Sequence, residues 1–171
     1  MSVEHIQNSV IDVIAYLKEN PEDAVSTDPP ITAVMEDGLR CRATGVNGES
    51  IVTDMPKAIG GGEAAPSPGW LSRAASATCD ATRIALHAAQ LGVTLDTLEV
   101  TVDSVSDDRG LLGLDDSISA GPVSVRTRVT IGAAGAAEET LREIVDFAVA
   151  HSPVAEGCRR ATPTKLEVKI A

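Results

Sequence analysis

The sequence predicts an α+β protein in which mostly antiparallel strands pack against a long apolar helix near the middle of the chain. Three observations support this fold class: an N-terminal stretch with helical periodicity, short alternating segments separated by Asp-Gly and Asn-Gly turns, and an Ala-rich run from Ser67 to Gly92. With 171 residues, 43% of them hydrophobic, the chain is long enough to bury one core.

The N-terminal region is predicted to form a helix over residues 3–19, followed by a polar connector. Its apolar residues recur every three or four positions: Val3, Ile6, Val10, Val13, Ile14 and Leu17. Asn20-Pro21 ends this pattern, and the connector runs to Pro30. We therefore separate residues 1–25, as a helical extension, from the domain over residues 26–171.

Three short strands are predicted next, over residues 31–35, 39–46 and 50–54. The dipeptides Asp37-Gly38 and Asn47-Gly48 stand where hairpin turns belong. In the second strand Cys41 shares a face with Leu39 and Ala43, so we interpret it as a small buried hydrophobe.

The second half of the chain is predicted to continue with the long helix, two long strands, a helix and a last strand. The long helix should begin at Ser67 or Pro68 and end at Leu91, because Gly92 is a typical helix stop. The later elements are expected around residues 98–102, 123–131, 136–151 and 166–170, with a short turn opening at Pro153.

Composition and charge argue against several classes of partner. A net charge of −11 and only one Trp, one Tyr and one Phe disfavour nucleic acid, which needs clustered cations and stacking rings. The same charge disfavours an anionic membrane surface. Glu4 and Asp12 interrupt any N-terminal signal peptide, and three cysteines, an odd number, indicate a reducing cytoplasm. No pattern indicates a metal or cofactor.

Cys79, inside the long helix, is the main candidate for chemistry. A helical wheel places it at the edge of one polar stripe, formed by Arg73, Ser76, Asp80, Arg83, His87 and Gln90. Arg83, one turn later, would favour the thiolate that a peroxide-reacting cysteine needs. The competing interpretation is that Cys79 packs as a small hydrophobe. His87 is either a base or a hydrogen-bonded structural residue.

Several segments of the chain resemble the OsmC/Ohr family of osmotically inducible and organic hydroperoxide reductase proteins. They are LRCRA (39–43), TDMPKAIGGGEAAPSPGWL (53–71), AASATC (74–79), DDRGLLGLDD (107–116) and HSPV (151–154). The resemblance covers about residues 30–171. It implies an intertwined homodimer, in which two sheets wrap two central helices and the active sites lie at the subunit interface.

The resemblance also implies a redox mechanism. In family members that reduce peroxides, a cysteine matching Cys79 attacks the peroxide, and a second cysteine then forms a disulfide with it. Here Ser152 stands at the second position, Gly69 replaces a family glutamate, and the hairpin arginine has only Arg40 and Arg42 as nearby substitutes. A hydroxyl cannot form a disulfide, so that step is lost at this position.

Three hypotheses follow for the function. Cys79 could be a one-cysteine peroxidase that an external thiol reduces, or Cys158 could resolve it. A helical continuation from Ser152 would carry Cys158 about 9 Å along the axis, whereas a disulfide needs Cα atoms within about 7 Å. In the third hypothesis the dimer has lost its activity and either binds a small apolar molecule or serves as a structural module that binds nothing specific.

Overall fold

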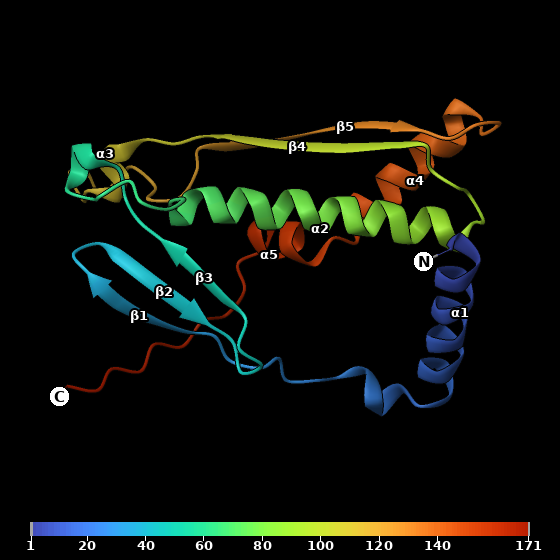
Figure 1. Cartoon of the computed structure of the whole chain (residues 1–171), viewed down its shortest axis with the longest axis horizontal. Coiled ribbons are helices and arrows are strands. Elements are labelled where there is room, and N and C mark those ends of the chain that lie inside the picture. Colours follow the sequence, from blue (N-terminus) through green and yellow to red (C-terminus); the bar gives the residue numbers. More distant parts are fainter. Residues whose placement is uncertain (1, 171) are drawn as a thin grey trace.

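The computed structural model describes residues 2–170 and contains five α-helices and five strands within that range, besides two short 3-10 helices at Pro21–Ala24 and Lys57–Ile59. The helices are α1 (Val3–Glu19), α2 (Pro68–Gln90), α3 (Asp108–Leu111), α4 (Glu138–Ala150) and α5 (Pro153–Arg159). The strands are β1 (Thr32–Asp37), β2 (Arg40–Thr44), β3 (Ser50–Thr53), β4 (Thr97–Val105) and β5 (Ser124–Gly132). Figure 1 shows α2 lying along the β4–β5 ribbon, with α5 on its other side and α1 at its far end.

The centre of the fold is a layer of helices on an antiparallel two-stranded sheet. β4 pairs with β5 from Thr97 opposite Gly132 to Val105 opposite Ser124. The buried cluster is formed by Ile84 and Ala88 of α2 with Ile144 and Ala148 of α4, and strand residues such as Val100 pack against it. The small alanine side chains let the two helices approach closely, so the Ala-rich composition of α2 has a direct packing role.

Local signals determine both ends of α2. The Ser67 hydroxyl accepts a hydrogen bond from the Trp70 N–H at 3.2 Å, and Pro68 occupies the first helical turn. At the other end Gly92 has φ +72°, and the Val93 N–H donates to the Ala88 carbonyl at 2.8 Å. The expected boundaries of this helix are therefore confirmed to within one residue.

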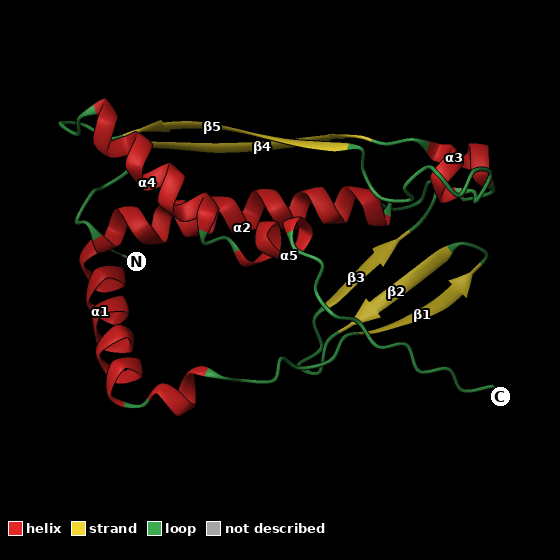
Figure 2. Ribbon diagram, turned by 180° about the vertical axis from the view of Figure 1, so that it is seen from behind, coloured by secondary structure: helices red, strands yellow, loops and turns green. Residues whose placement is uncertain are grey.

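The second sheet contains β1, β2 and β3 in that order, all antiparallel. Figure 2 shows that it lies apart from the β4–β5 ribbon, below the N-terminal part of α2 and on the opposite side of that helix. Its side chains are exposed or half-buried, and Cys41 is half-buried rather than buried as the alternation predicted. The reason is that, among residues 2–170, no helix or strand outside this sheet packs closely against it.

A buried carboxylate fixes the loop that leads from the second sheet into α2. Asp54 is 3% exposed and accepts hydrogen bonds from the backbone N–H groups of Met55, Gly62 and Ala64. These bonds, the one from Ala64 foremost, hold the pKa of Asp54 below its usual value. A side chain at Gly61 would collide with the Met55 carbonyl, 1.8 Å from the position of a Cβ. The glycine-rich sequence therefore serves a structural loop.

Two predictions about the C-terminal region are wrong. The segment that opens at Pro153 forms the seven-residue helix α5 instead of a short turn. Residues 161–170 form no strand, although Leu166, Val168 and Ile170 alternate with polar residues and are 70–87% exposed. A strand needs a hydrogen-bonded neighbour, and in this single chain no strand lies beside the tail.

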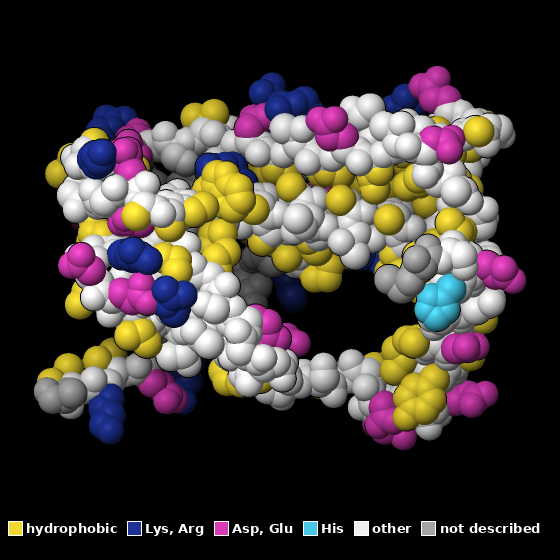
Figure 3. Space-filling model, in the orientation of Figure 1, with side chains coloured by type: hydrophobic (Ala, Val, Ile, Leu, Met, Phe, Trp, Pro, Cys, Tyr) yellow, Lys and Arg dark blue, Asp and Glu magenta, His cyan; other side chains and the backbone are white. Residues whose placement is uncertain are grey.

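Large apolar side chains remain exposed on several elements. They include Ile11 and Val13 on α1, Met35 on β1, Trp70 on α2 and the tail. Figure 3 shows an open gap bounded by α2, α1, the connector and the β1–β3 sheet, with hydrophobic side chains along α2 beside it. Among residues 2–170, no helix is long and apolar enough to cross a membrane.

Candidate functional site

The candidate site is centred on a contact between α2 and the start of α5. Cys79 lies in the middle of α2 and is half-buried, while Ser152 is the completely buried N-cap residue of α5. The Ser152 hydroxyl donates a hydrogen bond to Cys79 Sγ at 3.3 Å. A hydroxyl directed at sulfur is suited to stabilise negative charge on that sulfur. The structure thus brings together two predicted site residues that lie 73 positions apart.

The two histidines near this contact stack on the Phe147 ring, and this stack packs α2 against α4. The Phe147 ring lies between His87 and His151, with ring centroids 4.0 and 4.1 Å apart. His87 Nδ1 contacts the Gln90 side-chain oxygen at 3.0 Å, and His151 Nδ1 contacts the Phe147 carbonyl at 2.7 Å. His87 therefore has the partners of a structural residue.

The arginines predicted to assist Cys79 form no hydrogen bond with its sulfur within residues 2–170. Arg83 is half-buried, its Nε has no hydrogen-bond partner, and no hydrogen bond to Cys79 is found within residues 2–170. Arg40 and Arg42 lie on β2 and form ion pairs with Glu36 at 3.2 and 2.5 Å. The hydrogen bond from Arg42 is the main reason that the pKa of Glu36 lies below its usual value.

Cys158 lies on α5 and is exposed. Because α5 is helical through Arg159, Cys158 stands about 9 Å along the helix axis from Ser152. It lines a pocket of about 700 Å³ between α2, the β4–β5 sheet and α5, together with Gly69, Arg73 and Asp80. We call this the Asp80 pocket. Cys79 is not among the residues that line it.

Asp80 is the residue whose importance the sequence did not reveal. The helical wheel placed it in a polar stripe, yet its side chain is only 1% exposed and its Oδ1 has no hydrogen-bond partner. An acidic residue in the centre of an Ala-rich helix was the available signal. Its burial depends on the packing of the sheet and α5, which the helical pattern does not contain.

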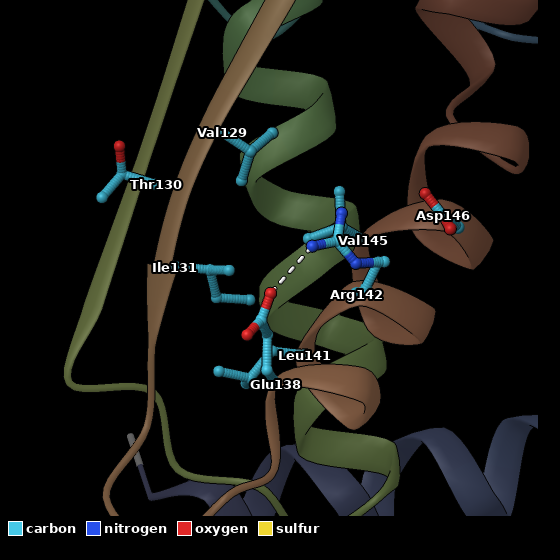
Figure 4. A pocket seen from close by; sticks show the side chains of 8 residues that line it. All are labelled: Val129, Thr130, Ile131, Glu138, Leu141, Arg142, Val145 and Asp146. Carbon is cyan, nitrogen blue, oxygen red and sulfur yellow. Dashed lines mark hydrogen bonds and ion pairs between the residues drawn. The ribbon is translucent and has the colours of Figure 1, made fainter.

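A smaller pocket of about 410 Å³ lies between β5 and α4. Figure 4 shows Glu138 and Arg142, whose side chains form an ion pair at 2.9 Å, beside Ile131 and Val145, which also line the pocket. None of the site residues predicted from the sequence lines this pocket. We therefore place the candidate site at Cys79 and Ser152.

Both the sequence and the fold connect this arrangement to one family. The family model described as OsmC-like protein matches residues 60–167, more than half of the chain and the whole region that contains Cys79 and Ser152. The chain belongs to the OsmC-like protein family. No curated protein sequence matches it.

Solved structures share the fold at low sequence identity. An OsmC-like protein from Mycoplasma pneumoniae has 17% identity and a TM-score of 0.67, with 80% of this chain and 91% of that chain covered. An organic hydroperoxide resistance protein from Elizabethkingia anophelis has 17% identity, a TM-score of 0.57 and coverages of 80% and 93%. The organic hydroperoxide resistance protein OhrB of Bacillus subtilis has 20% identity, a TM-score of 0.52 and coverages of 84% and 98%.

Proposed function

We propose that this protein reduces organic hydroperoxides through the Cys79 thiol and depends on an external thiol as reductant. The observation that carries the proposal is the 3.3 Å contact between Cys79 Sγ and the buried Ser152 hydroxyl. Membership of the OsmC-like family and similarity to organic hydroperoxide resistance proteins support the substrate class.

The chemistry proposed for Cys79 is a two-electron oxidation. The thiolate attacks the terminal peroxide oxygen, an S–O bond forms as the O–O bond breaks, and the alkoxide leaves as the alcohol after taking one proton. Cys79 is then a sulfenic acid. An external thiol attacks its sulfur and releases water, and a second thiol frees Cys79 and leaves with the first as a disulfide. Ser152 donates a hydrogen bond but takes no part in disulfide formation.

We also propose that the working unit is a homodimer. Only five hydrophobic residues of the described chain form its fully buried core, while Ile11, Met35 and Trp70 are 50–69% exposed. A second copy that covers these surfaces would explain why the small sheet and α1 bury so little. It would also supply a neighbour for the tail and a route by which Arg40 and Arg42 approach a Cys79 thiol.

The proposal is tested by stopped-flow oxidation of the reduced protein with cumene hydroperoxide and with hydrogen peroxide. Mass spectrometry would locate the oxidised sulfur in the original protein, Cys79→Ser and Cys158→Ser. Rapid, selective oxidation of Cys79 by the organic peroxide supports the proposal, and a sulfenic acid that persists until thiol is added identifies an external reductant. A disulfide between Cys79 and Cys158 would assign the resolving role to Cys158. Cys79 that stays reduced for minutes would overturn the peroxidase proposal.

One observation favours a second candidate function, a dimeric binding module without redox activity. The Asp80 pocket is lined by Ser76 and Asp80 but not by Cys79, so this pocket, the larger of the two described above, is not built around the thiol. Ser152 and Gly69 would then mark a site whose peroxide chemistry has been lost. Failure of Cys79 to react in the experiment above would select this alternative.

A further inference from the structure

A buried carboxylate without a counter-charge stands out beside the candidate site. Asp80 is 1% exposed, its Oδ1 has no hydrogen-bond partner, and it forms no ion pair within residues 2–170. The hydroxyl of Ser76, one turn away, already donates to the Ser72 carbonyl at 3.0 Å. A carboxylate that is almost completely withdrawn from water, with one oxygen left without a partner, destabilises the protein that holds it. A ligand that carries a positive charge into the pocket would remove this destabilisation.

The pocket that Asp80 lines has two unlike walls. The α2 wall is polar and presents Ser72, Ser76 and Asp80, whereas the strand wall alternates apolar with hydroxyl-bearing residues. Its apolar part is formed by Val102, Val123 and Val125, and its polar part includes Ser104 and Thr127. A volume of about 700 Å³ lies within the range of small-molecule sites. A molecule with polar groups for the helix and an apolar chain that lies against the valines would match both walls.

A second charge stands toward the other end of the pocket. Arg73 lies seven residues before Asp80, about 10 Å along the helix axis and on the same face. Its Nη1 is 3.5 Å from the Ser104 hydroxyl and 3.8 Å from where a Cβ of Gly69 would be, so the guanidinium is turned away from Asp80. Arg159 lines the same pocket but donates to the Val149 carbonyl at 3.2 Å and pairs with Glu156.

We propose that the Asp80 pocket binds an amino acid whose amino and carboxylate groups stand at opposite ends of an apolar chain. The ammonium group donates to Asp80 and neutralises it, which a hydroxyl could not do. The chain lies along the valines of the strand wall, and the carboxylate binds Arg73. The pocket includes Gly69 and Cys158 but neither Cys79 nor Ser152, so failure of Cys79 to react with peroxide would leave this inference standing.

The test is isothermal titration calorimetry of the full chain with four probes of matched length. These are 6-aminohexanoate, hexylamine, hexanoate and 1-hexanol. The aminohexanoate should bind most tightly. Asp80→Asn should weaken both amines at least about tenfold, the effect of losing one charge-assisted hydrogen bond, and leave hexanoate unchanged. Arg73→Gln should weaken the two carboxylates instead. Arg142→Gln, in the smaller pocket, is the matched control and should change none of the four.

Thermal unfolding separates a ligand site from a structural charge. Without ligand, Asp80→Asn should unfold at an equal or higher temperature, because the uncompensated charge is gone while the size of the side chain is kept. A lower melting temperature together with dissociation of the assembly would mean that protein groups neutralise Asp80, and the inference would fall. Equal binding of all four probes, or binding of none, would overturn it as well.

Discussion

The two halves of this molecule bury their apolar residues to very different extents. The layer formed by α2, α4, β4 and β5 closes around Ile84 and Ile144, which are 0% exposed. In α1 and in the β1–β3 sheet, by contrast, no hydrophobic residue is buried. The layer of α2, α4, β4 and β5 can be stabilised within one chain, because its helices and its sheet cover one another. Helix α1 and the β1–β3 sheet carry large apolar residues as well, but within residues 2–170 they have no surface against which these residues can be buried.

The largest loss of stability is expected from a substitution inside the buried layer. Ile144→Ala removes a completely buried side chain from the contact between α4 and α2, and should lower the free energy of unfolding by about 2–5 kcal/mol. Denaturant titration measures it. Val105→Ala, at a position 59% exposed, is the control and should stay within about 0.5 kcal/mol of the original protein. Equal losses for the two variants would contradict the division drawn above.

A second effect is expected at the exposed apolar surface around the start of α2. Trp70 is 50% exposed at the start of α2, and large aromatic residues dominate the binding energy of interfaces. If a second copy covers it, Trp70→Ala should weaken dimerisation by about 2 kcal/mol or more, a dissociation constant raised roughly thirtyfold. Sedimentation equilibrium measures this constant. A chain that stays at 17.7 kDa at every concentration would exclude the dimer.

A smaller, pH-dependent effect is expected at the link between the halves. Because hydrogen bonds hold the pKa of Asp54 below its usual value, the ionised carboxylate stabilises the fold above that usual value. This stability is lost as the pH falls through the lowered pKa. Asp54→Asn should therefore reduce the melting temperature at pH 7, and the difference should close toward pH 3. A difference that is the same at both pH values would argue against the role of the Asp54 charge.

The sequence predicted the helices and strands themselves better than the contacts between them and the burial of their side chains. The ends of α2 were predictable because Ser67, Pro68 and Gly92 act on the adjacent backbone. The pairing of Cys79 with Ser152 came only from the family resemblance, since no periodic pattern connects residues so far apart. The burial of Asp80 depends on how α5 and the sheet pack against α2, and the local pattern of α2 does not encode that packing. Residues 166–170 have the alternation of a strand, but a strand also needs a partner.

The smallest effect concerns the site, and it tests whether the layer positions Cys79 for chemistry. Ser152→Ala removes the only hydrogen bond to Cys79 Sγ found within residues 2–170, at a place where the fold should not change. Loss of one such donor corresponds to about 1 kcal/mol, so oxidation by cumene hydroperoxide should slow about fivefold. Stopped-flow kinetics of Cys79 oxidation measures this rate.

Ser152→Cys is the informative companion, because it puts a second sulfur where the hydroxyl now contacts Cys79. Peroxide should then convert the pair to a disulfide, seen as the loss of two thiols in a thiol assay and of two hydrogens by mass spectrometry. Cys158→Ser in the same background checks that the new cysteine is the partner. If Ser152→Cys yielded only sulfenic acid, the 3.3 Å contact would not describe the reacting geometry, and Cys79 would be better understood as part of the packing between α2 and α5.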